Sequence, residues 1–183
     1  MSTVVDFRHS SRFEVKRVNE NGRFMGRTAY WRLYFIENTL RVVINTVLSI
    51  QVDPRPYPTW WEYLYHGTTL MRDADRARRQ YLGSSPHTYP GRHGIYYVYL
   101  RDLGTIMHDN SVYFEPIMPE VDEWVLKIES VRLPRNCVGH MNLINAEDRH
   151  QINRLYYDCK GLIRKLQKVE VGPEKLVLQI PAV

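Results

Sequence analysis

The feature that most constrains this chain is a set of segments in which apolar residues recur every three or four positions. Residues 29–50 and 152–166 carry the two clearest examples. This spacing places the apolar side chains on one face of a helix, and such a face is buried by packing on other helices. The two stripes consist of Leu33, Ile36, Leu40, Val43 and Val47, and of Ile152, Leu155, Tyr156, Cys159, Leu162, Ile163 and Leu166. The pattern predicts a mainly α fold, a helical bundle.

The segments between the two stripes also favour helices. Pro54, Pro56 and Pro58 end the first long helix, and a second helix is predicted over 60–81, with Trp60 and Trp61 in the core. A loop rich in Gly, Ser and Pro follows at 83–94. Helical spacing returns around 99–107 and again around 121–131. Asn145 is suited to cap the last helix, with Asp148 at its third position.

The two ends of the chain favour strands. Phe13, Val15 and Arg17 alternate before Asn21-Gly22, a dipeptide suited to a hairpin turn. After Gly172-Pro173 the apolar residues alternate again, at Leu176, Leu178 and Ile180. We therefore expect the two ends to pair into a small sheet beside the bundle. The predicted division of this single domain is a β arm at 1–28, a helical bundle at 29–167 and a C-terminal strand at 168–183.

The composition fits one ordinary globular domain. The chain has 183 residues, of which 44% are hydrophobic and 25% charged. The longest apolar run, around Val42–Ile50, is too short to span a bilayer, and we expect no signal peptide. With reduced Cys137 and Cys159, the expected location is cytoplasmic. The formal net charge of +5 permits an anionic partner such as RNA.

One polar stretch, RLPRNCVGHMN at 132–142, has the residues of a catalytic site. Pro134 is predicted at the first position of a short helix, which puts Arg135 and Asn136 in the first turn, where free backbone N–H groups favour an anion. His140 follows Arg135 by five residues, so the two side chains lie roughly 140° apart on a straight helix. Either the first turn is irregular or a second copy of the helix completes the site. Gly139 would let another backbone approach closely.

The chemistry of these residues suits cleavage of RNA without a metal. A histidine moves protons near neutral pH, an arginine holds phosphate oxygens, and Asn136 could orient either group. Arg101 and His108 form a second pair, seven residues apart and on one helical face. Spacing alone does not separate these pairs from a solvated arginine beside a partly buried histidine.

The segment RNCVGHMNLINAEDRHQI at 135–152 resembles the signature of HEPN domains, of the type found at the C-terminus of a yeast nuclear RNA quality-control endonuclease and in bacterial toxin and defence proteins. WRLYFIENTLRVVI is similar to the family's first long helix, and 97–136 to the segment before the motif. The resemblance implies an endoribonuclease with its active site shared across a homodimer, acting as a toxin or antiviral effector. It assigns Arg135, Asn136 and His140 to catalysis, with Glu37 and Arg41 as supporting residues.

The same resemblance implies RNA as the substrate, cleavage without a metal, and an antitoxin or defence-system protein as a further partner. We expect no cofactor and no metal site, because no histidine pair has metal-ligand spacing with an acid nearby. One alternative is a non-catalytic HEPN module that serves dimerisation or RNA binding. A remote alternative comes from YLYHGTT at 63–69, which is similar to the start of ADP-ribosyltransferases that use NAD. That fold needs many strands around the motif, whereas helical spacing flanks it here. The pair Glu37 and Arg41, one turn apart, also reads as a surface salt bridge.

Overall fold

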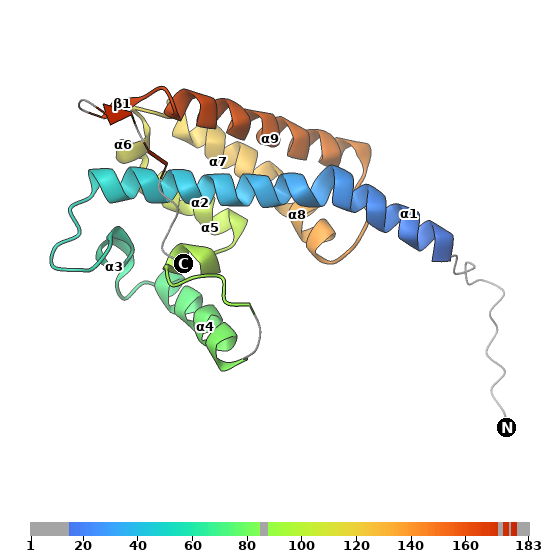
Figure 1. The fold of residues 1–183 in the computed structure, drawn as a ribbon, viewed down its shortest axis with the longest axis horizontal. Coiled ribbons are helices and arrows are strands. Elements are labelled where there is room, and N and C mark those ends of the chain that lie inside the picture. Colours follow the sequence, from blue (N-terminus) through green and yellow to red (C-terminus); the bar gives the residue numbers. More distant parts are fainter. Residues whose placement is uncertain (1–14, 85–87, 172–173, 176, 179–183) are drawn as a thin grey trace.

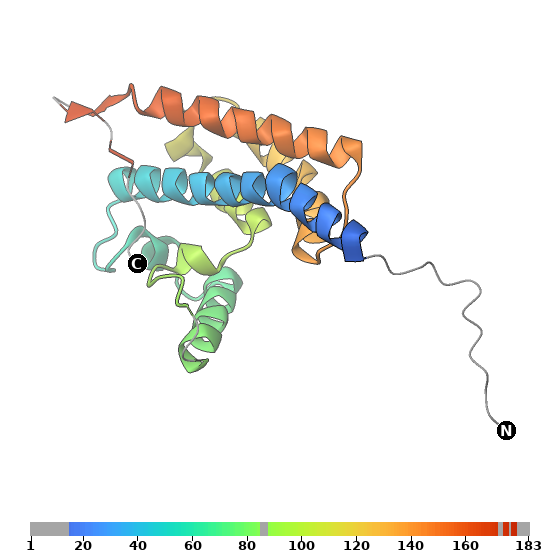
Figure 2. The same ribbon diagram turned by 45° about the vertical axis from the view of Figure 1, so that its right-hand side comes forward.

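The protein is a bundle of helices in which two long ones lie side by side (Figure 1). The computed structural model describes residues 15–84, 88–171, 174–175 and 177–178. Helices α2 (Trp31–Gln51) and α9 (Ala146–Leu166) run in the same direction and stay adjacent when the molecule is turned (Figure 2). Helices α5 (Leu100–Asp109), α7 (Val121–Ser130) and α8 (Arg132–Gly139) pack behind them.

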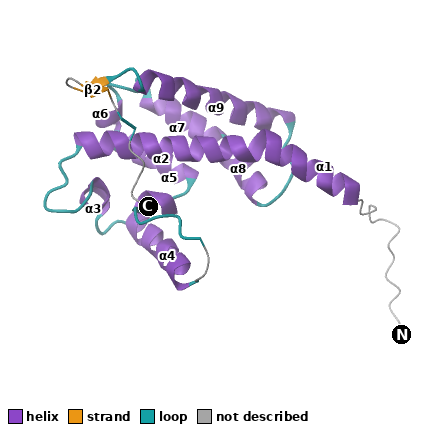
Figure 3. Ribbon diagram, viewed as in Figure 1, coloured by secondary structure: helices purple, strands orange, loops and turns teal. Residues whose placement is uncertain are grey.

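The remaining elements are short or peripheral. Helix α1 (Val15–Met25) leads through a π-helical turn, η1 (Gly26–Tyr30), into α2, and α3 (Trp60–Tyr65) and α4 (Thr69–Gly83) form the lower part in Figure 1. A 3-10 turn, η2 (Gly94–Tyr97), precedes α5, and α6 (Ser111–Phe114) follows it. Strands β1 (Glu170–Val171) and β2 (Glu174–Lys175) pair antiparallel (Figure 3).

The predicted helical bundle is confirmed, and its core consists of the predicted stripes. The five apolar residues of the first stripe are at most 5% exposed. In the second stripe only Ile163 is partly exposed, and the others are buried. Trp60 and Trp61 are buried as expected. Asn145 caps α9 by accepting from the backbone N–H of Asp148 at 2.8 Å, as predicted.

The predicted helix over 60–81 is helical over most of its length but is split into α3 and α4, because the chain turns sharply at Gly67. Gly67 has a φ of +74°, a conformation that only glycine adopts at little cost. Thr59 caps α3 and Thr68 caps α4 through their side-chain oxygens. The turn separates α3, which contributes its tryptophans to the core, from the more exposed α4.

The predicted N-terminal hairpin is also wrong where the structure describes it. Val15 to Met25 are helical, and Asn21-Gly22 lies inside α1 instead of forming a turn. Extending an existing helix needs no new nucleus, so α1 grows from η1 and α2 at low cost. Phe13 lies outside the described residues.

The expected sheet between the two ends is likewise wrong in its pairing, because β1 pairs with β2, its neighbour in sequence. In the predicted C-terminal strand, Leu178 is partly buried without regular structure. Leu176 and Ile180 lie outside the described residues.

Residues Val18–Gln51 form one continuous helical stretch that is much longer than the apolar run around Val42–Ile50. By length and composition alone this stretch of 34 residues could cross a membrane, with a mean hydropathy of 1.2 in its most apolar window. In that window, 56% of the residues are buried inside the bundle. The same positions carry the first apolar stripe, so they form the central core helix of this fold.

Candidate functional site

Helix α8 carries the Arg/His motif but begins earlier than predicted. It starts at Arg132, so Leu133 is helical and buried Pro134 is the third residue of the helix. The first N–H groups of a helix have no acceptor within it, so a proline is tolerated there as well as at the first position. The backbone N–H of Arg135 donates to the Val131 carbonyl at 2.9 Å. It is therefore not free to bind an anion, and the expected backbone cradle at Arg135 is wrong.

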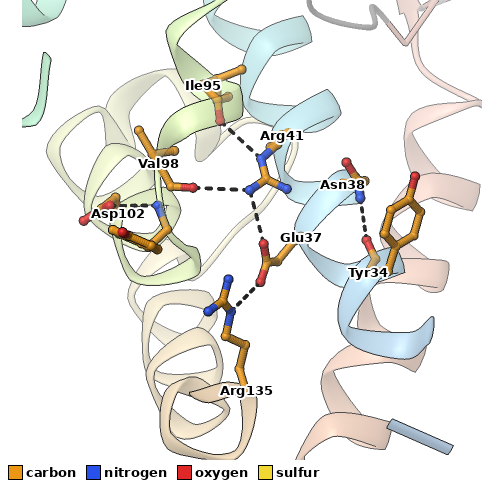
Figure 4. Close-up of polar contacts among 9 residues, drawn as sticks. Tyr34, Glu37, Asn38, Arg41, Ile95, Val98, Asp102 and Arg135 are labelled. Carbon is orange, nitrogen blue, oxygen red and sulfur yellow. Dashed lines mark hydrogen bonds and ion pairs between the residues drawn. The ribbon is translucent and has the colours of Figure 1, made fainter. Parts of the chain in front are cut away.

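The side chain of Arg135 is held instead by an acid from α2. Its Nε donates to Glu37 Oε1 at 2.8 Å, and the other carboxylate oxygen, Oε2, accepts from Arg41 Nη2 at 3.1 Å (Figure 4). The Glu37 side chain is 13% exposed and that of Arg135 is 31% exposed. One carboxylate thus bridges two guanidinium groups, and the cluster carries a net positive charge. We call Glu37, Arg41 and Arg135 the Glu37 cluster.

Arg41 ties this cluster to a distant part of the chain. Its Nε donates to the Ile95 carbonyl and its Nη2 to the Val98 carbonyl, each at 3.2 Å (Figure 4). These carbonyls lie in η2 and just before α5. The Glu37–Arg41 pair is therefore a partly buried structural contact, and the reading of it as a surface salt bridge is wrong. Sequence reasoning did not find Ile95 and Val98, because a backbone acceptor more than fifty residues away leaves no local pattern.

His140 ends α8 in a defined C-terminal turn. The N–H of Met141 donates to the Val138 carbonyl at 3.0 Å, and the N–H of Asn142 donates to the Cys137 carbonyl at 2.9 Å. These two bonds form a Schellman motif, in which the residue after the cap is left-handed and is usually glycine. Here Met141 has that conformation, with a φ of +59°. The motif fixes the backbone of His140, whose side chain is exposed.

Asn136 and Gly139 complete the exposed side of α8. The Asn136 side chain is exposed, and its backbone carbonyl accepts from the N–H of His140 at 2.9 Å. A Cβ added at Gly139 would meet Arg135 Nη1 at 3.8 Å, which is ordinary contact. The packing of this chain alone therefore does not require glycine there. The same distance places the Arg135 guanidinium beside the residue that precedes His140.

An apolar groove adjoins His140. A cavity of 440 Å³ opens between α1, η1 and the end of α8. Met141, at its edge, is 85% exposed, and Leu143 is 56% exposed. Val18, Met25, Tyr30 and Val138 supply the other large apolar side chains. We call this surface the α1–α8 groove.

The second Arg/His pair lies on α5 in different surroundings. Arg101 and His108 are both exposed. His108 has acids beside both ring nitrogens, with Nδ1 3.4 Å from Asp109 Oδ1 and Nε2 4.0 Å from Asp122 Oδ1. Arg101 lines a separate cavity of 610 Å³ between α4 and α5. Neither residue contacts the Glu37 cluster within the described part of the chain.

The YLYHGTT segment lies between α3 and α4, in a helical setting. Tyr65 is buried, and its hydroxyl accepts from Asn110 Nδ2 at 2.8 Å. Burial raises the pKa of Tyr65 well above its ordinary value. His66 caps the end of α3 and is exposed, as expected for a helix-end histidine. The described residues around this segment form no strands.

Comparison with protein-family models, with curated proteins and with solved structures gave no match for this chain.

Proposed function

We propose that this protein is a metal-independent endoribonuclease whose active site is shared across a homodimer. The observation that supports this most is the anchoring of Arg135. Glu37 accepts from its Nε, and no described residue accepts a hydrogen bond from its two terminal nitrogens, of which Nη1 lies near Gly139. Asn136 and His140 are exposed on the same helix. The resemblance of the segment 135–152 to HEPN nucleases points the same way.

The proposed reaction is an internal attack on a backbone phosphate. A neutral imidazole accepts the proton of the ribose 2′-hydroxyl, and the 2′-oxygen bonds to phosphorus. The bond from phosphorus to the 5′-oxygen breaks, and that oxygen receives a proton from a second, protonated imidazole. The products are a 2′,3′-cyclic phosphate and a 5′-hydroxyl. Arg135 binds the nonbridging oxygens and opposes the charge that grows on them.

This reaction needs two imidazoles, and α8 supplies one per chain. The segment around Arg135 is regular helix, so an irregular first turn does not bring Arg135 and His140 to one phosphate. The alternative is a second copy facing the first across a two-fold axis. The α1–α8 groove supports that arrangement, because it presents exposed apolar side chains beside His140. Within the proposal, Glu37 is a positioning residue that aims Arg135, and Arg41 holds Glu37.

The setting proposed for this activity is a toxin or antiviral effector, with an antitoxin or defence-system protein as partner. The second candidate function, a non-catalytic module that binds RNA, would use the same basic surface. It would not need the proton-carrying group of His140.

The proposal is tested by the chemistry of the cut. A single-stranded RNA, the DNA of the same sequence and the 2′-O-methyl RNA are each incubated with the protein in EDTA. We expect cleavage of the RNA alone, with cyclic-phosphate and 5′-hydroxyl ends identified by mass spectrometry. Intact RNA, or equal cleavage of the 2′-O-methyl strand, would contradict the proposal. Binding of RNA without cleavage would favour the non-catalytic module.

A further inference from the structure

A second group of cations lies where α2 and α9 begin, and none of the described residues that line the cavity between them is acidic. This cavity of 330 Å³ is formed by Thr28, Arg32, Ala146, Arg149, His150 and Asn153. Its polar groups are two guanidinium groups, an imidazole, an amide and a hydroxyl. A cavity with only cationic and neutral walls concentrates anions. We call it the Arg32 pocket.

Arg32 is partly buried, yet no described carboxylate pairs with it. Its Nη1 donates to the Thr28 carbonyl, and its Nε is buried with no hydrogen-bond partner among the described residues. Arg41 and Arg135 are also partly buried, and both pair with Glu37. A cation removed from water without a counterion is unfavourable. Within the described part of the chain, Arg32 therefore has no counterion, and a bound anion would stabilise it.

Aromatic rings hold both arginines of the pocket. The guanidinium carbon of Arg32 lies 4.9 Å from the centre of the Trp31 ring and 5.7 Å from that of Tyr156. The guanidinium carbon of Arg149 lies 5.1 Å from the centre of the Phe24 ring. Ring contacts of this kind restrict a guanidinium group without using its N–H donors. Two restrained donor groups on different helices thus line one cavity.

We propose that the Arg32 pocket binds a phosphate group. A guanidinium group matches phosphate with paired N–H donors, and the Asn153 amide can add a neutral hydrogen bond. The phosphate can belong to an RNA strand or to a free phosphorylated compound, because the recognising chemistry is the same. Only residues 141–145 separate His140 from Ala146 at the start of α9, so the pocket lies at the motif's end of the bundle (Figure 1).

The test measures binding without turnover. In the His140→Ala chain, a fluorescent single-stranded RNA is titrated by anisotropy, and inorganic phosphate is titrated by calorimetry. Arg32→Gln and Arg149→Gln each remove one cation from the pocket. Arg79→Gln, an exposed position on α4, removes the same charge elsewhere. We expect each pocket variant to weaken binding of at least one probe about tenfold, and Arg79→Gln to change either by less than about twofold.

The two probes identify the source of the phosphate. A loss of affinity for RNA, with a salt dependence lower by about one counterion, shows that the pocket binds a phosphate of an RNA strand. A loss for inorganic phosphate alone assigns it to a small phosphorylated compound. The inference would be overturned if the pocket variants bound both RNA and inorganic phosphate as tightly as the His140→Ala parent or the Arg79→Gln control. The melting temperature of each variant is measured first. If Arg32→Gln unfolds, Arg149→Gln is the decisive variant. Failure of the cleavage proposal leaves this result unchanged, because no reaction is involved.

Discussion

The two Arg/His pairs contain the same residue types and are both accessible, yet the fold treats them differently. On α8, Arg135 is anchored to a partly buried carboxylate, and a Schellman motif fixes the backbone of His140. On α5, Arg101 has no described ion-pair partner, and His108 lies between two exposed acids. On α8 the Arg135 side chain and the His140 backbone are thus held in place, whereas on α5 two acids lie beside the imidazole of His108. The spacing of the residues in the sequence does not predict these different surroundings, because they depend on tertiary contacts.

The largest expected difference between the pairs is in cleavage of RNA. Arg135→Ala removes the group proposed to stabilise charge on the phosphate, and we expect the rate to fall at least about 100-fold. Arg101→Ala removes an exposed cation and should lower the rate less than about twofold. Initial rates on a labelled single-stranded RNA, with folding checked by circular dichroism, compare them directly. Equal losses would mean that the choice of α8 over α5 is wrong.

The next effect concerns the surface beside His140. Leu143→Asp places a charge in the exposed α1–α8 groove, and we expect it to convert a dimer to a monomer and to reduce cleavage at least about tenfold. Leu126→Asp, at a 70% exposed position on α7, is the matched control and should leave both unchanged. Light scattering gives the mass in solution. A dimeric, fully active Leu143→Asp variant would show that the groove is not the shared interface.

A smaller effect tests the anchor that distinguishes Arg135. Glu37→Gln leaves two arginines facing each other without the carboxylate between them. We expect the free energy of unfolding to fall by about 1–2 kcal/mol, less than for a fully buried pair because Arg135 is partly exposed. Glu123→Gln, an exposed acid on α7, should change it by less than about 0.5 kcal/mol. Urea denaturation measures both, and an unchanged Glu37→Gln variant would contradict the anchoring role.

The smallest effect is at the turn that ends α8. Met141 has a left-handed backbone that costs a non-glycine residue roughly 1–2 kcal/mol, and its side chain is 85% exposed. Met141→Gly should raise the free energy of unfolding by less than about 1 kcal/mol, because glycine also gains entropy in the unfolded chain. Thermal unfolding checks the sign. A clear loss of stability would mean that Met141 makes contacts the exposed turn does not suggest.

The sequence predicts the bundle well, because each apolar stripe is visible within its own segment of sequence and has to be buried in the fold. Their spacing alone predicts that Leu33, Ile36, Leu155 and Cys159 lie in the core, and all four are buried. The break at Gly67-Thr68 also had a local signal, since a glycine followed by a threonine suits the end of one helix and the cap of the next. The hairpin signal at Asn21-Gly22 was misleading, because helix continuation from α2 outweighs a turn preference.

The candidate site could be predicted only in part. The motif residues Arg135, Asn136 and His140 were found from their chemistry and from the family resemblance, and the structure places all three on or at the end of α8. The contact from Arg135 to Glu37 joins residues 98 positions apart. Such a contact depends on how α2 and α8 pack, which no periodicity encodes. Arg32 gave no signal either, because its buried Nε, which has no partner among the described residues, is a property of the folded chain alone.

The role of His140 as proton carrier is decided by the rate of RNA cleavage in EDTA by the parent chain, His140→Ala and His108→Ala, followed from about pH 5 to 8. We expect a pH-dependent rate for the parent, an equal rate for His108→Ala and a loss of about 100-fold or more for His140→Ala. A His140→Ala chain that cleaves like the parent, or a parent with a flat profile, would contradict that role.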